Sequence, residues 1–111
     1  MGYKFIIKRN TNGYRFILFP NNSNSKVIGE SIPYDSEGEC VEKLESFRKL
    51  VKENKINLHV KERNNVFYPS IVVDQTALFT LERGYPYHRY ECDNWIQRIK
   101  SNIDAPLKVS L

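Results

Sequence analysis

Two segments of the chain, 30–51 and 82–103, align without a gap at a constant offset of 52 residues. The first reads ESIPYDSEGECVEKLESFRKLV and the second reads ERGYPYHRYECDNWIQRIKSNI. Few residues are identical, but apolar positions coincide along the alignment: Cys40 with Cys92, Leu44 with Ile96, Phe47 with Ile99, and Val51 with Ile103. This shared register predicts that one supersecondary unit occurs twice in the chain.

The residues before the first copy alternate between apolar and polar side chains, as half-buried strands do. They predict strands at 3–9, 14–19 and 27–31. Asn12-Gly13 lies between the first two strands and is typical of a type I′ hairpin turn, which needs positive φ at both central residues. Pro20 is expected to end the second strand because it has no N–H to donate.

A helix with a clear start follows these strands. Ser36 and Glu39 have the spacing of a capping box, in which each side chain satisfies a free N–H of the first turn. The apolar residues after them recur with helical spacing and predict a core-facing stripe: Cys40, Leu44, Phe47 and Val51. The charged residues between them indicate a solvated face: Glu42, Lys43, Glu45, Arg48 and Lys49.

The second half repeats this plan, with strands expected at 57–63, 66–74 and 77–82 and a helix over about 89–102. Pro69 interrupts the middle strand, so this strand is expected at an edge or with a bulge there. Register places His88 at the helix cap, with Glu91 three residues on. In the tail that follows, 107–111 is long enough to add an edge strand.

The sequence therefore predicts an α+β fold. We expect residues 1–111 to form a single compact domain made of two β-β-β-α repeats, 1–55 and 56–111. An antiparallel sheet with both helices packed on one side would bury the apolar faces, and the two repeats would be related by a pseudo-twofold axis. Such a chain is either a monomer with an internal pseudo-dimer or a homodimer.

The first repeat resembles the YegP-like family of small bacterial proteins. The resemblance rests on the runs F-x-I-x-K, G-Y-x-F-x-L and V-I-x-x-S-x-x-Y-x-S, followed by an apolar helix. The residues that carry it are Phe5, Ile7, Lys8, Gly13, Tyr14, Phe16, Leu18, Val27, Ile28, Ser31, Tyr34, Ser36 and Cys40. It implies β-β-β-α units, used as dimers or in tandem, and no assigned biochemical function.

Composition narrows the classes of function. The net charge of +4 and the pI near 9.1 permit a nucleic-acid partner, although no dense basic stripe is present. The two cysteines fall in helical patterns and are expected to be buried thiols, and two Cys with two His at no useful spacing do not suggest a zinc site. The amino terminus begins a strand pattern rather than a signal peptide, so the cytoplasm is the expected compartment and no membrane partner is implied.

No catalytic signature stands out in the chain. It contains no Gly-rich phosphate loop, no G-x-S-x-G and no H-E-x-x-H. An enzyme is therefore the least expected class, and no cofactor or metal is implied.

The densest unusual segment is RGYPYHRYE at 83–91. Tyrosine and arginine are enriched in protein–protein hot spots, and the same pair stacks on bases and pairs with phosphates. A structural alternative is that the tyrosines close the end of the core. The residues expected to bind a protein partner are Arg83, Tyr85, Tyr87, His88, Arg89 and Trp95; those expected to bind nucleic acid, the alternative, are Arg83, Arg89, Arg98 and Lys100 with the same tyrosines.

Trp95 stands where the first copy has Lys43. Its spacing from Cys92 and Ile99 allows it to widen the core stripe of the second helix, whereas an exposed Trp95 would be an interface residue. We interpret the function as that of a small non-enzymatic binding protein, an inhibitor or accessory protein among the options, with the 83–91 segment providing specificity.

Overall fold

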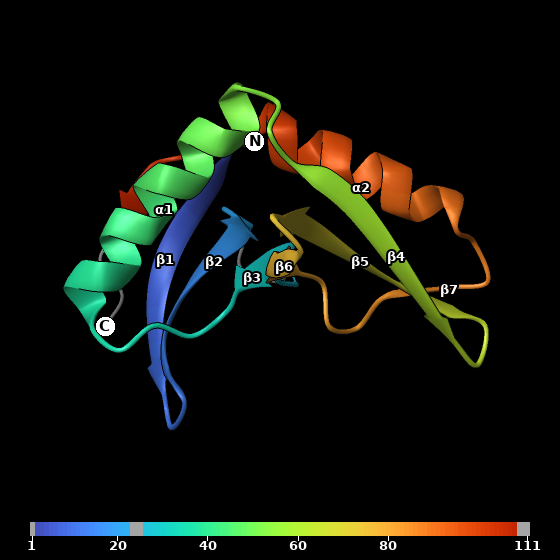
Figure 1. Ribbon diagram of the computed structural model, residues 1–111, viewed down its shortest axis with the longest axis horizontal. Helices are drawn as coiled ribbons and strands as arrows, with labels where there is room; N and C mark the ends of the chain where they lie inside the picture. Colours follow the sequence, from blue (N-terminus) through green and yellow to red (C-terminus); the bar gives the residue numbers. More distant parts are fainter. Residues whose placement is uncertain (1, 23–25, 109–111) are drawn as a thin grey trace.

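A computed structural model describes residues 2–22 and 26–108. The first half contains β1 (Tyr3–Asn10), β2 (Gly13–Pro20), β3 (Gly29–Ser31) and α1 (Glu37–Lys52). The second half contains β4 (Asn57–Arg63), β5 (Val66–Val73), β6 (Thr76–Thr80), β7 (Tyr85–Pro86), α2 (Tyr90–Ser101) and β8 (Leu107–Lys108). The fold is α+β, and Figure 1 shows both helices on the same side of the sheet, with their C-terminal ends converging.

The strands form a single sheet in the order β4-β5-β6-β3-β2-β1-β8, with β7 paired to β5. The third strands of the two halves meet at its centre, where Glu30 pairs with Thr80 and Ser31 pairs with Phe79. We expected an antiparallel sheet, but β8 pairs parallel to β1, so the sheet is mixed. The sheet therefore runs without interruption from the strands of one half to the strands of the other.

The start of α1 confirms the capping box. Ser36 is the N-cap, and its hydroxyl accepts the N–H of Glu39 at 3.1 Å. The Glu39 carboxylate accepts the N–H of Asp35 at 3.0 Å, one residue before the cap. The predicted stripe is buried in full, because all four of its residues face the sheet: Cys40, Leu44, Phe47 and Val51.

The C-terminal tail pairs with the first half through β8; residues 109–111 of the edge strand expected at 107–111 lie outside the described residues. The N–H of Phe5 donates to the Pro106 carbonyl at 2.9 Å, and β8 continues this contact. Arg48 of α1 donates to the Ala105 carbonyl at 2.6 Å and lies over the Phe5 ring. Arg48 was expected on the solvated face of α1, and the tail accounts for the difference.

The first hairpin turn lies one residue earlier than predicted. Asn10 pairs with Gly13, so Thr11 and Asn12 form the loop, and of these turn residues only Gly13 has positive φ, at +127°. The turn is therefore not type I′. A Cβ at Gly13 would overlap the carbonyl oxygen of Tyr34, which pairs with Tyr14 across this strand. The glycine allows that close approach.

Both turns of the second half show the positive φ values that type I′ turns require. Asn64 and Asn65, between β4 and β5, have φ of 52° and 64°. The same geometry recurs between β5 and β6, where Asp74 and Gln75 have φ of 49° and 68°.

Three further expectations, for the strands and for the start of α2, were wrong. Pro69 does not mark an edge, because β5 lies between β4 and β6; the irregularity in its pairing with β6 falls between Ile71 and Val72. The third strands are shorter than predicted, since β3 begins at Gly29 and β6 ends at Thr80. The N-cap of α2 is Arg89 rather than His88, and the Arg89 side chain forms no capping hydrogen bond.

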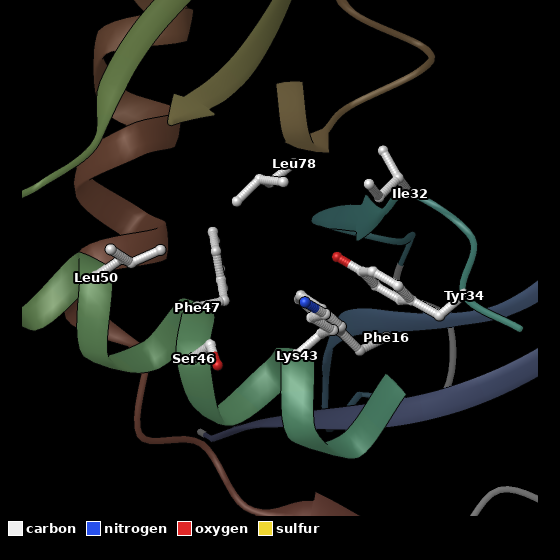
Figure 2. Close-up of a pocket in the computed structure, with 8 residues that line it drawn as sticks. All are labelled: Phe16, Ile32, Tyr34, Lys43, Ser46, Phe47, Leu50 and Leu78. Atoms are coloured by element: carbon white, nitrogen blue, oxygen red, sulfur yellow. The ribbon is translucent and has the colours of Figure 1, made fainter. Parts of the chain in front are cut away.

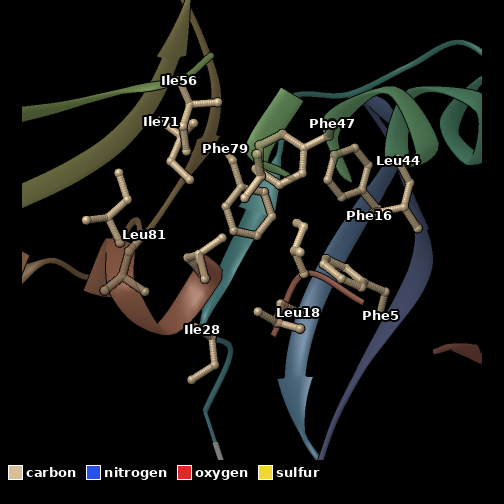
Figure 3. Packing of buried hydrophobic residues seen from close by; sticks show 14 of the residues in the cluster. Phe5, Phe16, Leu18, Ile28, Leu44, Phe47, Ile56, Ile71, Phe79 and Leu81 are labelled. Carbon is tan, nitrogen blue, oxygen red and sulfur yellow. The ribbon is translucent and has the colours of Figure 1, made fainter. Parts of the chain in front are cut away.

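One hydrophobic cluster contains residues of both halves. The Phe79 ring lies at its centre, with ring centroids 5.1 Å from Phe47, 5.8 Å from Phe16 and 6.2 Å from Trp95. Figure 3 shows Phe79 between side chains of the two halves. Because β6 places this ring directly beside β3, the central strand pair and the shared core depend on the same residue.

Gly29 of β3 tests this packing. A Cβ at this position would overlap the Phe79 ring, whereas a Cβ at Gly38 of α1 would meet nothing within 4 Å. We expect Gly29→Ala to lower the free energy of unfolding by about 1–3 kcal/mol, the usual cost of overpacking. The matched control Gly38→Ala should be neutral or stabilising by up to about 1 kcal/mol, because alanine favours helix. Urea unfolding of both variants measures this, and equal effects would contradict the packing.

Candidate functional site

The segment 83–90, here called the aromatic loop, joins β6 to α2 and is held to the sheet by a strand that the sequence did not predict. In β7, Pro86 pairs with Val66 and Tyr85 pairs with Phe67. Gly84 before it has φ of +62°, and a Cβ there would lie 2.8 Å from the Phe67 carbonyl oxygen. Only glycine fits this close approach, so the loop has a defined path along β5.

Two tyrosines of the aromatic loop project into solvent. Among the described residues, the large hydrophobic side chains that stand exposed are Tyr87, at 75%, and Tyr90, at 59%. Tyr87 has φ of +68°, and its N–H donates to the Asn65 carbonyl at 2.7 Å. The His88 ring lies 5.3 Å from the Tyr90 ring. The hairpin turn at Asn65 therefore holds Tyr87 in a left-handed conformation that non-glycine residues adopt infrequently.

Two more predicted residues of the aromatic loop, Tyr85 and Arg89, differ in burial. Tyr85 is half-buried, and burial is the main reason that its pKa is raised; Arg98 and Arg83 oppose that rise. Its hydroxyl is therefore protonated at neutral pH. Arg89 is exposed at the N-cap of α2, and its side chain forms no capping hydrogen bond.

Two of the six predicted partner-binding residues bind the first half of the chain instead. The Arg83 guanidinium donates a hydrogen bond to the Val27 carbonyl. The Trp95 indole donates to the Ile28 carbonyl at 2.7 Å, and Trp95 is only 1% exposed. Trp95 therefore widens the core stripe and is not part of an exposed surface, which corrects its place in the predicted site.

One of the four basic residues predicted for nucleic acid, Lys100, lies away from the aromatic loop. Lys100 lies in the last turn of α2, roughly 15 Å along the axis from Tyr90 at 1.5 Å per residue. Its amine is 3.5 Å from the Asn54 amide oxygen, at the converging helix ends. Near the loop, Glu91 and Asp93 occupy the first turn of α2. Arg89 and Arg98 are thus interspersed with carboxylates.

Both cysteines are free and fully buried, as predicted for small hydrophobes. Burial, with Glu37 and Glu39, raises the pKa of Cys40 to about 11, and burial is also the main cause of the raised pKa of Cys92. Within residues 2–22 and 26–108, no group of His, Cys, Asp or Glu is placed to hold a metal ion. No helix in the same residues is long and apolar enough to cross a membrane.

A second feature, which the sequence did not signal, is a cavity of about 240 Å³ beside α1 (Figure 2). Apolar side chains from α1, β2, β6 and the segment after β3 line it, with two polar residues from α1. The lining residues are Phe16, Ile32, Tyr34, Lys43, Ser46, Phe47, Leu50 and Leu78. Helical periodicity assigned Lys43 to the solvated face and could not show which strand residues lay opposite it.

The architecture has counterparts among solved structures. It superimposes on the solution structure of YegP from E. coli, a protein of unknown function, with a TM-score of 0.75 over 99% of this chain and 94% of that one. The chain has the YegP fold. A UPF0339 protein from Shewanella oneidensis gives a TM-score of 0.71 over 98% of this chain and 92% of its own.

Sequence identity to both proteins is 19%, so the likeness to YegP concerns the fold. No protein-family model and no curated protein matches the chain. The resemblance noted in the first repeat is confirmed for the fold. The superposition covers both halves of the chain.

Substitutions of Trp95 and Tyr87 test which of these aromatic residues contributes to the stability of the fold. Trp95→Phe keeps a ring in the core but leaves the Ile28 carbonyl without its donor, so we expect a loss of about 1–3 kcal/mol of stability. Tyr87→Phe alters an exposed ring and should change stability by less than about 0.5 kcal/mol. Chemical denaturation of both variants measures the difference. A neutral Trp95→Phe would argue against the buried hydrogen bond.

Proposed function

We propose that this chain is a small non-enzymatic binding protein and that its aromatic loop binds a protein partner. The observation that supports this most directly is the exposure of Tyr87 and Tyr90 on a loop whose backbone is fixed by β7. Large aromatic side chains are usually covered, and clusters of them at a surface are typical of interaction sites.

The backbone geometry of the loop favours binding over chance exposure. Tyr87 adopts φ of +68°, a conformation that costs energy for a residue with a side chain. Residues held in such conformations are concentrated at ligand-binding and catalytic sites. The hydrogen bond to Asn65 fixes the Tyr87 backbone before any partner arrives, which lowers the entropy lost on binding.

The chemistry of the loop indicates the kind of surface it would bind. The Tyr87 and Tyr90 rings supply apolar contact with hydroxyls at the rim, and His88 packs against one of them. Arg89 adds a planar cation that pairs well with carboxylates. A partner with an apolar pocket bordered by acidic residues would complement these groups. Glu91 and Asp93 in the adjacent turn disfavour a phosphate backbone, so nucleic acid is the second candidate.

The two free, buried thiols fit a protein that acts in the cytoplasm, where thiols stay reduced. A monomer suffices for this proposal, because all the residues of the loop surface come from one chain and the loop is ordered by contacts within it.

Substitution of the exposed rings tests the proposal. We expect Tyr87→Ala with Tyr90→Ala to weaken partner affinity by roughly 30-fold or more, as a hot-spot loss of about 2 kcal/mol requires. Proteins cross-linked from cells are compared between wild type and variant by mass spectrometry, and the affinity of any that differ is then measured by calorimetry. Lys49→Ala, on the exposed side of α1, is the control and should bind normally.

The outcomes separate the candidate functions. Identical partner profiles for wild type and the double variant would contradict a role for the aromatic loop. Labelled oligonucleotides at about 50 and 200 mM salt test the second candidate, because phosphate contacts give affinities that fall steeply over this range. Salt-sensitive binding that is lost in Arg89→Ala would favour nucleic acid over protein.

A further inference from the structure

The cavity beside α1 is apolar and large enough for a small organic molecule. Its walls are the side chains of Phe16, Ile32, Phe47, Leu50 and Leu78, which come from α1, β2, β6 and the segment after β3. Its volume is about 240 Å³. A dry cavity of about 150 Å³ with similar walls can bind benzene, so there is space for one ring and a short side chain.

The cavity is open because of one difference between the two halves. Position 95, which is 52 residues after Lys43, is a tryptophan. Trp95 is buried, stacks 6.2 Å from Phe79 and donates to the Ile28 carbonyl, so its indole fills the space between α2 and the sheet. Lys43 is exposed and leaves the space beside α1 unfilled.

The polar groups at the cavity can donate hydrogen bonds and carry positive charge. Figure 2 shows the Tyr34 hydroxyl directed into the space that Phe47, Leu78 and Lys43 surround. Burial raises the pKa of Tyr34, so its hydroxyl keeps the proton it would donate. Lys43 forms no ion pair with any residue in 2–22 or 26–108. The Glu39 carboxylate, four residues earlier on α1, accepts the Asp35 N–H and is not paired with Lys43 among the described residues.

We infer that this cavity binds a small carboxylate with a single apolar ring, the ring against Phe16, Phe47 and Leu78 and the carboxylate at Lys43 and the Tyr34 hydroxyl. Charge complementarity selects the carboxylate, since none of the described residues that line the cavity is acidic and Lys43 is among them. The volume selects one ring rather than two. This inference does not depend on the aromatic loop.

The probe is 3-phenylpropionate, titrated into the ¹⁵N-labelled protein and followed by NMR. We expect saturable shifts of the amides of Tyr34, Phe47 and Leu50, while those of the aromatic loop stay in place. Lys43→Gln should weaken binding by roughly 5-fold, the size of one exposed ion pair. Lys49→Gln, a lysine of α1 outside the lining, is the matched control and should bind as wild type.

Two further comparisons complete the test. Lys43→Trp places in α1 the residue that fills the space beside α2, and it should abolish binding while the protein stays folded by circular dichroism. The neutral 3-phenylpropanol should bind several-fold more weakly than the acid. The inference is overturned if no amide shifts at millimolar probe, or if Lys43→Gln or the alcohol binds as tightly as wild type binds the acid. The Tyr87→Ala/Tyr90→Ala protein should bind the probe normally, so failure here is distinct from failure of the proposed function.

Discussion

The contact of the Phe79 ring with Gly29 across the β3–β6 pair is the constraint on which the rest of the structure depends. The pair is short, with Glu30 opposite Thr80 and Ser31 opposite Phe79, and its hydrogen bonds alone are few. The ring adds burial, because it stacks on Phe16 and Phe47 from one half and Trp95 from the other. A glycine is required at position 29, two residues along β3 from Ser31, since any side chain there would occupy the space of the Phe79 ring. The continuous sheet and the shared core follow from this contact.

Differences between the halves explain where binding chemistry can arise on this fold. In the second half the Trp95 indole fills the space beneath α2 and donates a hydrogen bond to the Ile28 carbonyl. The exposed aromatic side chains of this half are those of the aromatic loop, Tyr87 and Tyr90. In the first half Lys43 leaves a cavity beside α1. The same framework therefore offers an exposed aromatic surface in one half and a recessed apolar space in the other.

The sequence predicted those parts of the fold that depend on local periodicity. The apolar stripes of both helices, the Ser36 cap and the strands β1, β2 and β4 follow from spacing alone. What it missed depends on partners distant in the chain. β7 forms because Gly84 allows a close approach to the Phe67 carbonyl. The first hairpin turn lies one residue earlier than predicted, and there Gly13 accommodates the Tyr34 carbonyl. Neither contact produces a periodic pattern of apolar residues in the sequence.

The candidate site was predicted in part for the same reason. A run of tyrosines and arginines identifies an unusual loop. Tyr87 of the predicted site is exposed, and so is Tyr90, which the predicted site did not include. Composition cannot show that Arg83 and Trp95 donate to the carbonyls of Val27 and Ile28, since those carbonyls lie more than 50 residues away in the chain. The cavity beside α1 was hidden because its lining combines helix positions with strand residues that meet them only in the folded protein.

The central claim is that the two halves share one core and unfold together. Urea unfolding followed at once by Trp95 fluorescence, which reports on the second half, and by NMR amide signals of α1 and β1, which report on the first, tests it most directly. Because Phe79 packs against both halves, the account predicts coincident midpoints and a single cooperative transition. Two separated transitions, with α1 and β1 retained after the Trp95 signal is lost, would contradict it.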